Sequence, residues 1–97
     1  MNEVARFDIA DHLDSDEAIA LYLSLVLESG DMEELLAAIN HIARAKGISQ
    51  IAANTGFGRE SLYKSLKPGS KPRFETILKV LQALGIQLTA APAAHSN

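Results

Sequence analysis

The sequence predicts an all-α domain of five helices with a helix-turn-helix near its centre. Its 97 residues are enough for one domain with a single modest core. Apolar residues recur at helical spacing along most of the chain, and glycines stand where these patterns stop. Alternation of apolar and polar residues suggests short strands only at residues 6–10 and 86–89.

Residues 49–66 hold two short helical patterns separated by a glycine. Ser49 offers a hydroxyl that can cap the first helix, and Gly56 stands where the chain must reverse with a positive φ angle. Leu62 and Leu66 are four residues apart, so they share the inward face of the second helix. This pattern predicts a helix-turn-helix. An ordinary αα-hairpin in a small bundle is the alternative, and the flanking charge favours DNA.

The outward face of the second helix carries side chains that can read base edges. Arg59 can donate two parallel hydrogen bonds to a guanine, the commonest specific base contact. Glu60 can accept from cytosine and would repel phosphate, while Lys64 can reach a base or a phosphate. Tyr63 completes this face.

The net charge of −3 hides a division of the chain into an acidic and a basic part. Residues 1–36 contain ten acids and one base, whereas residues 37–97 contain eight bases and two acids. Such segregation is not needed for solubility, so each part is expected to face a different partner. The alternative for the acids is that they keep the domain soluble and cap two helices.

The first expected helix, residues 16–29, is apolar around nearly its whole circumference, whereas a surface helix has one apolar stripe. In so small a domain we expect this helix to bury against a second subunit or a partner protein. The expected interface residues, for a homodimer or for another protein partner, are Phe7, Leu21, Leu23, Leu25 and Val26.

The remaining segments are expected to be two helices, a basic loop and a tail. Asp31 and Glu34 resemble a capping box at the start of a helix that stops at Gly47. A last helix covers residues 74–84, and residues 90–97 should be frayed. The loop before that last helix contains proline, glycine and three bases that could clamp a DNA backbone, namely Lys67, Lys71 and Arg73. A merely solvated basic loop would look identical.

No catalytic, cofactor or metal chemistry is expected. The chain has no cysteine, and His12, His41 and His95 have no second ligand at metal-binding spacing. Ser61, His41 and an acid could be imagined as a triad, but no glycine-flanked nucleophile turn accompanies them. Neither a signal peptide nor a membrane span is visible, so a cytoplasmic protein is expected.

Residues 44–88 resemble the HigA-like addiction-module antidote family, whose helix-turn-helix is of the phage-repressor (Xre) class. The resemblance rests on RESLYKSL at residues 59–66 and PRFETILKVLQALG at residues 72–85. It extends upstream to YLSLVLESGD at residues 22–31. One departure is Gly58, which stands where a capping serine or threonine is usual, so the second helix could fray at its start.

The resemblance implies a five-helix, phage-repressor-like domain that acts as a dimeric DNA-binding antitoxin. Such proteins neutralise a basic RelE/ParE-type toxin by direct binding and repress their own operon at an inverted repeat. It also implies the recognition positions Arg59, Glu60, Ser61, Tyr63 and Lys64. Toxin binding is then expected on the acidic residues 1–36, with Phe7, Leu21 or Leu25 as buried anchors. A phage-type repressor without a toxin is the alternative function.

Overall fold

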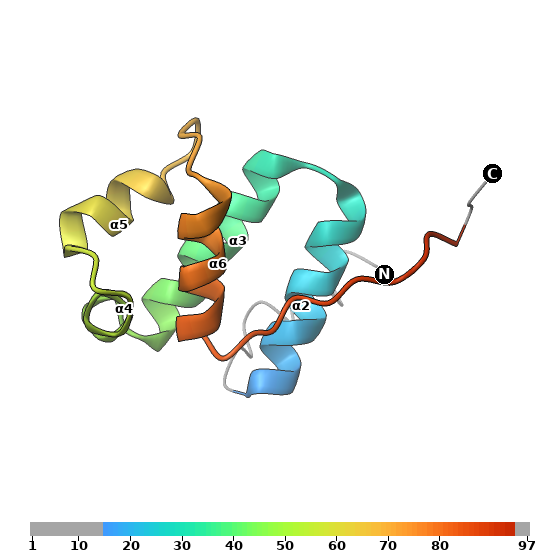
Figure 1. The fold of residues 1–97 in the computed structure, drawn as a ribbon, viewed down its shortest axis with the longest axis horizontal. Helices are drawn as coiled ribbons and strands as arrows, with labels where there is room; N and C mark the ends of the chain where they lie inside the picture. The colour runs from blue at the N-terminus through green and yellow to red at the C-terminus, as the bar shows by residue number, and fades with distance from the viewer. Residues whose placement is uncertain (1–14, 95–97) are drawn as a thin grey trace.

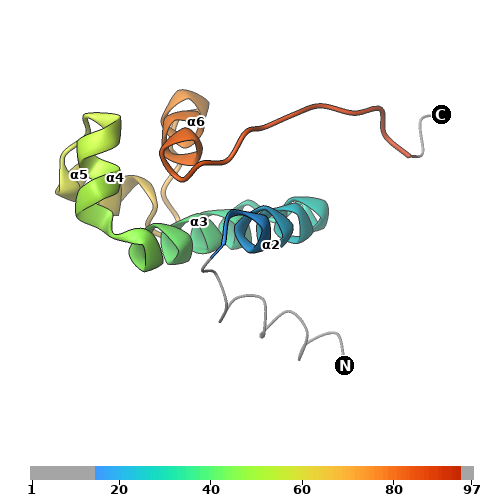
Figure 2. The same ribbon diagram turned by 90° about the horizontal axis from the view of Figure 1, so that it is seen from below.

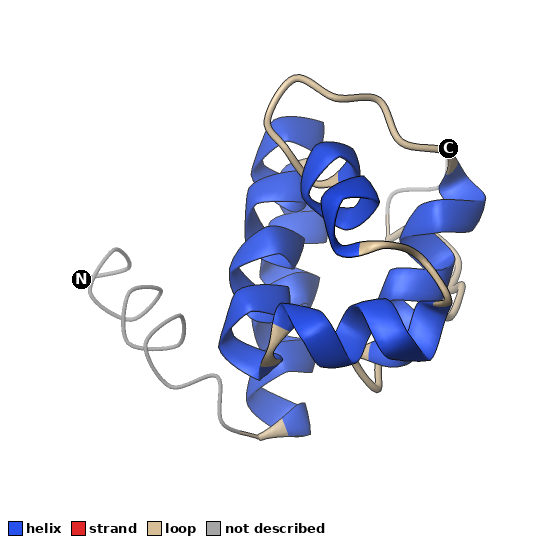
Figure 3. Cartoon of the chain, turned by 90° about the vertical axis from the view of Figure 1, so that its left-hand side faces the viewer, coloured by secondary structure: helices blue, strands red, loops and turns tan. Residues whose placement is uncertain are grey.

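The computed structural model describes residues 15–94, and within them it contains five helices and no strand (Figures 1 and 3). The helices are α2 (Asp16–Ser29), α3 (Met32–Lys46), α4 (Ile48–Thr55), α5 (Arg59–Ser65) and α6 (Phe74–Ala83). The expected all-α architecture is therefore confirmed. No helix within residues 15–94 is both long enough and apolar enough to cross a membrane.

The helices form one core to which all five contribute. α2 and α3 lie side by side as a helical hairpin, and α4 contacts α3, α5 and α6 (Figures 1 and 2). The most deeply buried side chains include Ile19, Ile39, Ile42, Leu62 and Val80. In both views α5 lies at one end of the molecule, away from α2 (Figures 1 and 2).

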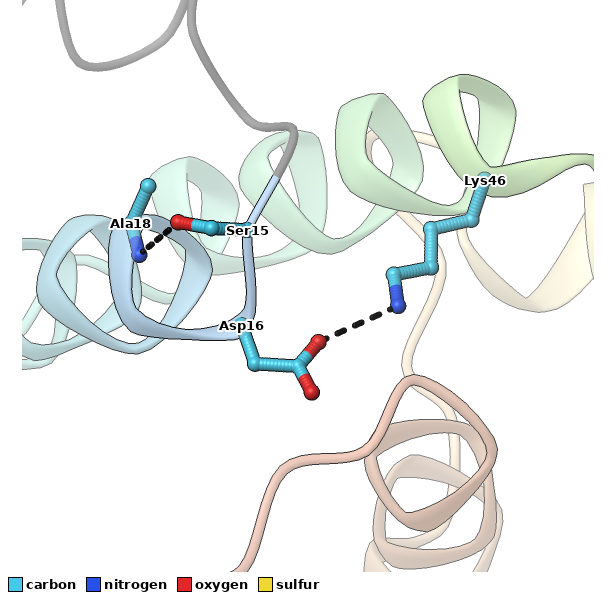
Figure 4. Close-up of polar contacts among 4 residues, drawn as sticks. All are labelled: Ser15, Asp16, Ala18 and Lys46. Atoms are coloured by element: carbon cyan, nitrogen blue, oxygen red, sulfur yellow. Dashed lines mark hydrogen bonds and ion pairs between the residues drawn. The ribbon is translucent and has the colours of Figure 1, made fainter.

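Polar side chains fix the starts of the first two described helices. The Ser15 hydroxyl accepts a hydrogen bond from the Ala18 N–H at 3.1 Å, and Asp16 pairs with Lys46 at 3.3 Å (Figure 4). At the start of α3, the Asp31 carboxylate accepts from the N–H groups of Glu33 and Glu34. These bonds satisfy N–H groups that have no partner inside the helix. The caps expected at the two helix starts are therefore confirmed, although the Asp31 N–H donates to the Ser29 hydroxyl at 3.2 Å, which differs from the expected capping box.

The predicted cap at Ser49 is wrong. α4 begins at Ile48, so Ser49 lies inside the helix, and Gly47 precedes it without a side-chain cap. Gly47 ends α3 with a positive φ of 107°, and its carbonyl already accepts from the N–H groups of Gln50 and Ile51. Because one glycine serves both helices, no separate capping residue stands between them.

The strand expected at residues 86–89 is absent. Gly85 adopts a left-handed φ of 83°, and the Ile86 N–H donates back to the Leu81 carbonyl, which ends α6. Residues 87–94 make no backbone hydrogen bond within the described part of the chain. A strand requires a pairing partner, and residues 15–94 supply none there. The strand expected at residues 6–10, with Phe7, lies outside the described residues.

Two of the residues expected at an interface belong instead to the core. Leu23 is 3% exposed and Val26 is 1% exposed, because they face α3 and the rest of the core together with Ile19. The prediction that Val26 docks a partner is therefore wrong, since the chain itself buries it, whereas Leu23 also lines a groove beside α2. Leu25 is half-buried, and Leu21 remains 51% exposed. Only part of the apolar circumference of α2 thus lacks a partner within the chain.

Because Val26 is buried and Leu21 is exposed, a charge added at these two positions of α2 should change the stability by different amounts. Val26→Asp should lower the free energy of unfolding by more than about 3 kcal/mol, because it buries an unpaired carboxylate. Leu21→Asp, on the exposed side of the same helix, should change it by less than about 1 kcal/mol. Urea denaturation followed by circular dichroism measures both. A stable Val26→Asp variant would contradict this placement of α2.

Candidate nucleic-acid interface

Burial of two leucines determines how α5 sits on the molecule. Leu62 and Leu66 are both fully buried, whereas most other side chains of the helix are exposed. The turn before it is fixed by Gly56, with a left-handed φ of 81°, and by the Thr55 hydroxyl, which accepts from the Phe57 N–H at 3.2 Å. This turn and the two leucines hold α5 across α4 with its polar side outward.

The structure places all eight sequence-predicted nucleic-acid contacts on the surface of the molecule. Five lie on α5, and the other three lie at its end and in the following loop. All are exposed: Arg59, Glu60, Ser61, Tyr63, Lys64, Lys67, Lys71 and Arg73. α5 begins after Gly58 without a side-chain cap, as the sequence predicted. Its first N–H groups are therefore not occupied by a capping side chain.

The five bases of this set have no acidic partner. Within residues 15–94, none of Arg59, Lys64, Lys67, Lys71 and Arg73 forms an ion pair or a side-chain hydrogen bond. Two bases elsewhere are engaged, because Lys46 pairs with Asp16, and Lys79 lies 4.0 Å from Glu75. The uncompensated positive charge is thus concentrated on α5 and the adjoining loop, which can attract an anion.

The basic loop is held to the rest of the fold by hydrogen bonds. The Ser70 hydroxyl donates to the Ser65 carbonyl at 2.6 Å, and the Ser70 N–H donates to the Lys67 carbonyl at 3.1 Å. The Gly69 N–H donates to the Glu33 carboxylate of α3 at 2.9 Å. These bonds connect the loop to the end of α5 and to α3, so its bases have a defined position beside the α5 surface.

One residue of this surface was not identified from the sequence. The Arg44 guanidinium of α3 lies over the Tyr63 ring, 5.2 Å from the ring centre, and its Nε donates to the Asn40 side chain at 3.3 Å. This cation–π contact ties the flank of α5 to α3. The two residues lie on different helices, so no local pattern pairs them.

The described residues contain no metal site. Within residues 15–94, no group of three or more His, Asp and Glu side chains is placed to hold a metal ion. The chemistry of the α5 surface is that of hydrogen-bond donors and positive charge.

Five helices, with α4 and α5 joined through a glycine turn, define an all-α helix-turn-helix-like domain. Residues 3–92 match the model of a family described as "Probable addiction module antidote protein", and the chain belongs to this family. It is 47% identical over 85 residues to an uncharacterised protein of Haemophilus influenzae (strain ATCC 51907 / DSM 11121 / KW20 / Rd), covering 88% of each chain. No solved structure matches the chain.

Family membership supports an antitoxin role. The expected addiction-module class is therefore confirmed, while the HigA-like and Xre assignments stay predictions.

The contact between Arg44 and Tyr63 predicts a measurable coupling energy. A double-mutant cycle with Arg44→Ala and Tyr63→Leu should give about 0.5–1 kcal/mol in the free energy of unfolding, as exposed cation–π pairs do. A control cycle pairs Arg44→Ala with Phe57→Leu, whose ring lies near Lys79 instead, and should give a coupling near zero. Equal couplings in both cycles would contradict a specific Arg44–Tyr63 contact.

Proposed function

We propose that this protein is the antitoxin of a type II toxin–antitoxin module. It binds a RelE/ParE-type toxin directly and, as a homodimer in the cytoplasm, binds an inverted-repeat operator to repress its own operon. Membership of the addiction module antidote family is the observation that carries the antitoxin part. The unpaired bases on and beside α5 support the DNA-binding part.

The geometry of α5 suits binding in the major groove. A helix held from behind by two buried leucines offers its outward residues to base edges, as recognition helices do. Arg59 lies in the first turn of α5, the part of a recognition helix that contacts bases, and can pair with a guanine. The bases after α5 would contact phosphates, which supply salt-dependent affinity without sequence information.

The acids of α2 and α3 divide into those already bound and those left for a partner. Asp16 pairs with Lys46, Asp31 caps α3, and Glu33 holds the basic loop. Glu34 accepts a hydrogen bond from the Ser29 hydroxyl at 2.8 Å. Part of the acidic charge therefore has a structural role, as the alternative interpretation of these acids proposed.

Two acids of α2 are left without a partner inside the described chain, namely Glu17 and Glu28. Helical spacing places them on the same face as the exposed Leu21, and we call these three residues the α2 stripe. An apolar side chain between two free carboxylates suits a basic partner with an apolar pocket. We place the toxin on this stripe, at a distance from α5.

A phage-type repressor without a toxin is the competing function. Binding of this chain to the protein encoded by the neighbouring gene distinguishes the two functions. Coexpression of both, with a tag on the neighbour only, should copurify this chain as a stable complex. A neighbour that leaves this chain unbound, while this chain binds DNA upstream of its own gene, would favour the repressor and contradict the antitoxin.

Arg59 and Lys67 should differ in how they affect DNA binding. Arg59→Ala should cost about 1–3 kcal/mol on the operator and little on random duplex, because it removes a base contact. Lys67→Ala should weaken binding to both duplexes similarly and reduce the slope of affinity against salt by about one, because it removes a phosphate contact. Fluorescence anisotropy at several salt concentrations measures these effects. Equal losses on both duplexes for Arg59→Ala would contradict direct readout.

Charge reversal on the α2 stripe should slow association with the toxin. Glu28→Lys should lower the association rate several-fold at low salt and less at higher salt, because screening weakens long-range attraction. Glu75→Lys makes the same charge change on α6 and should leave the rate nearly unchanged. Stopped-flow or surface plasmon resonance gives both rates. An equal slowing by the two variants would show that only the net charge matters and that the toxin does not dock on the stripe.

A further inference from the structure

The exposed apolar side chains of this domain gather around one groove. The groove has a volume of about 760 Å³ and lies between α2, the start of α3, α6 and the segment after α6. Six large apolar side chains are exposed in the described chain, and four of them line this groove: Leu27, Met32, Phe74 and Leu88. Phe74 is 68% exposed although it begins an otherwise apolar helix face. Apolar surface concentrated in this way marks a binding surface.

One wall of the groove is an extended segment that has no pairing partner among residues 15–94. We call residues 86–94 the C-terminal arm; it leaves α6 in the direction away from α4 and α5 (Figures 1 and 2). Ile86 packs partly against the core, and the groove is lined by all four residues of the first part of the arm, Ile86, Gln87, Leu88 and Thr89. Beyond Ile86 the arm makes no backbone hydrogen bond within the described residues.

The sequence pattern at the start of the arm is therefore that of a strand, but beyond Ile86 its backbone is unpaired within the described residues. Alternation of apolar and polar residues is the pattern of a half-buried strand. Free backbone donors and acceptors on an extended segment pair readily with a second extended segment. Pro92 has no N–H group, so it limits such pairing to the first part of the arm.

We propose that the second strand is the same arm of a second copy. The two arms pair antiparallel about a two-fold axis, and Leu88 of each chain enters the groove of the other. This assigns the homodimer surface, which the proposed function requires but does not identify. A paired two-stranded ribbon alone is marginal in water, so the groove contacts supply the burial that stabilises it.

Self-complementarity favours a second copy over the toxin as the occupant. The groove and the unpaired arm that forms one of its walls belong to the same chain, so each subunit of a two-fold dimer can offer both parts to the other. Charge does not select a basic partner here, since the charged side chains that line the groove are one acid and one base, Glu33 and Lys71. The unpaired acids of α2 lie instead on the α2 stripe, which does not line the groove.

The absence of cysteine from the chain makes the pairing directly testable. Single cysteines at residues 87, 88, 89 and 90 should form intermolecular disulfides efficiently only at the residue nearest the two-fold axis. Each residue further along an antiparallel pair separates the two copies by about 7 Å more, beyond disulfide reach. Ala45→Cys, at an exposed position of α3, is the control and should not crosslink. Crosslinking that is absent, or equal at all positions, would overturn the proposal.

Sedimentation equilibrium with two matched variants tests the groove contact. Leu88→Asp should weaken dimerisation at least about tenfold, because it places a carboxylate in the apolar groove. Gln82→Asp adds the same charge at an exposed position of α6 that does not line the groove, and it should leave dimerisation nearly unchanged. Both keep the helical core, which circular dichroism checks.

A monomeric wild-type chain at tens of micromolar, or a Leu88→Asp variant that dimerises normally, would overturn this assignment. A Leu88→Asp variant that stays dimeric but loses the toxin would do the same and would assign the groove to the toxin. The crosslinking and sedimentation measurements use neither operator DNA nor toxin. If the wild-type chain is dimeric and binds operator and toxin, failure of the crosslinking or of the Leu88→Asp effect would overturn only the dimer surface and leave the proposed function standing.

Discussion

The burial of Leu62 and Leu66 is the contact on which the candidate site depends. α5 has seven residues and no side-chain cap at its start, so it is too short to be stable in isolation. Two fully buried leucines provide the packing that holds it. Their four-residue spacing also sets its rotation, which turns Glu60 and Lys64 outward, while Arg59 is exposed at the first position of the helix. The packing of two side chains in the core thus decides which side chains of α5 reach the surface.

The molecule carries three kinds of surface, and Lys71 belongs to two of them, the basic loop and the groove. Unpaired bases surround α5, unpaired acids flank Leu21 on the α2 stripe, and exposed apolar side chains surround the groove beside the C-terminal arm. Opposite charges on one small domain would neutralise each other if they were adjacent, and separation lets each attract its own partner. Glu33 joins two of these regions, since it lines the groove and accepts the hydrogen bond from Gly69 of the basic loop.

The helices and the outward face of α5 could be predicted from the sequence because their determinants are local. Helical spacing, Asp31 as a cap, and Gly56 at the turn are all properties of short segments. Ser49 was misassigned because Gly47 ends one helix and starts the next. Val26 could not be told from Leu21 by apolarity alone, since which side of α2 meets α3 depends on the packing of distant helices. The Arg44–Tyr63 contact depends on the same packing.

The strand pattern at residues 86–89 was misread for a different reason. A strand is a property of a pair, and the sequence of one chain does not say whether its partner lies in the same chain. The pattern was present, but the part of the chain that the structure describes offers it nothing to pair with.

Amide hydrogen exchange of the protein with DNA from upstream of its own gene tests whether α5 is a sequence-reading helix. The operator duplex should slow exchange in α5 and in the loop at residues 67–73, while α2 should be unaffected. A shuffled duplex at the same salt concentration should protect these segments less. Protection confined to α2 and α3, or equal protection by both duplexes, would contradict the conclusion that α5 is a sequence-reading helix.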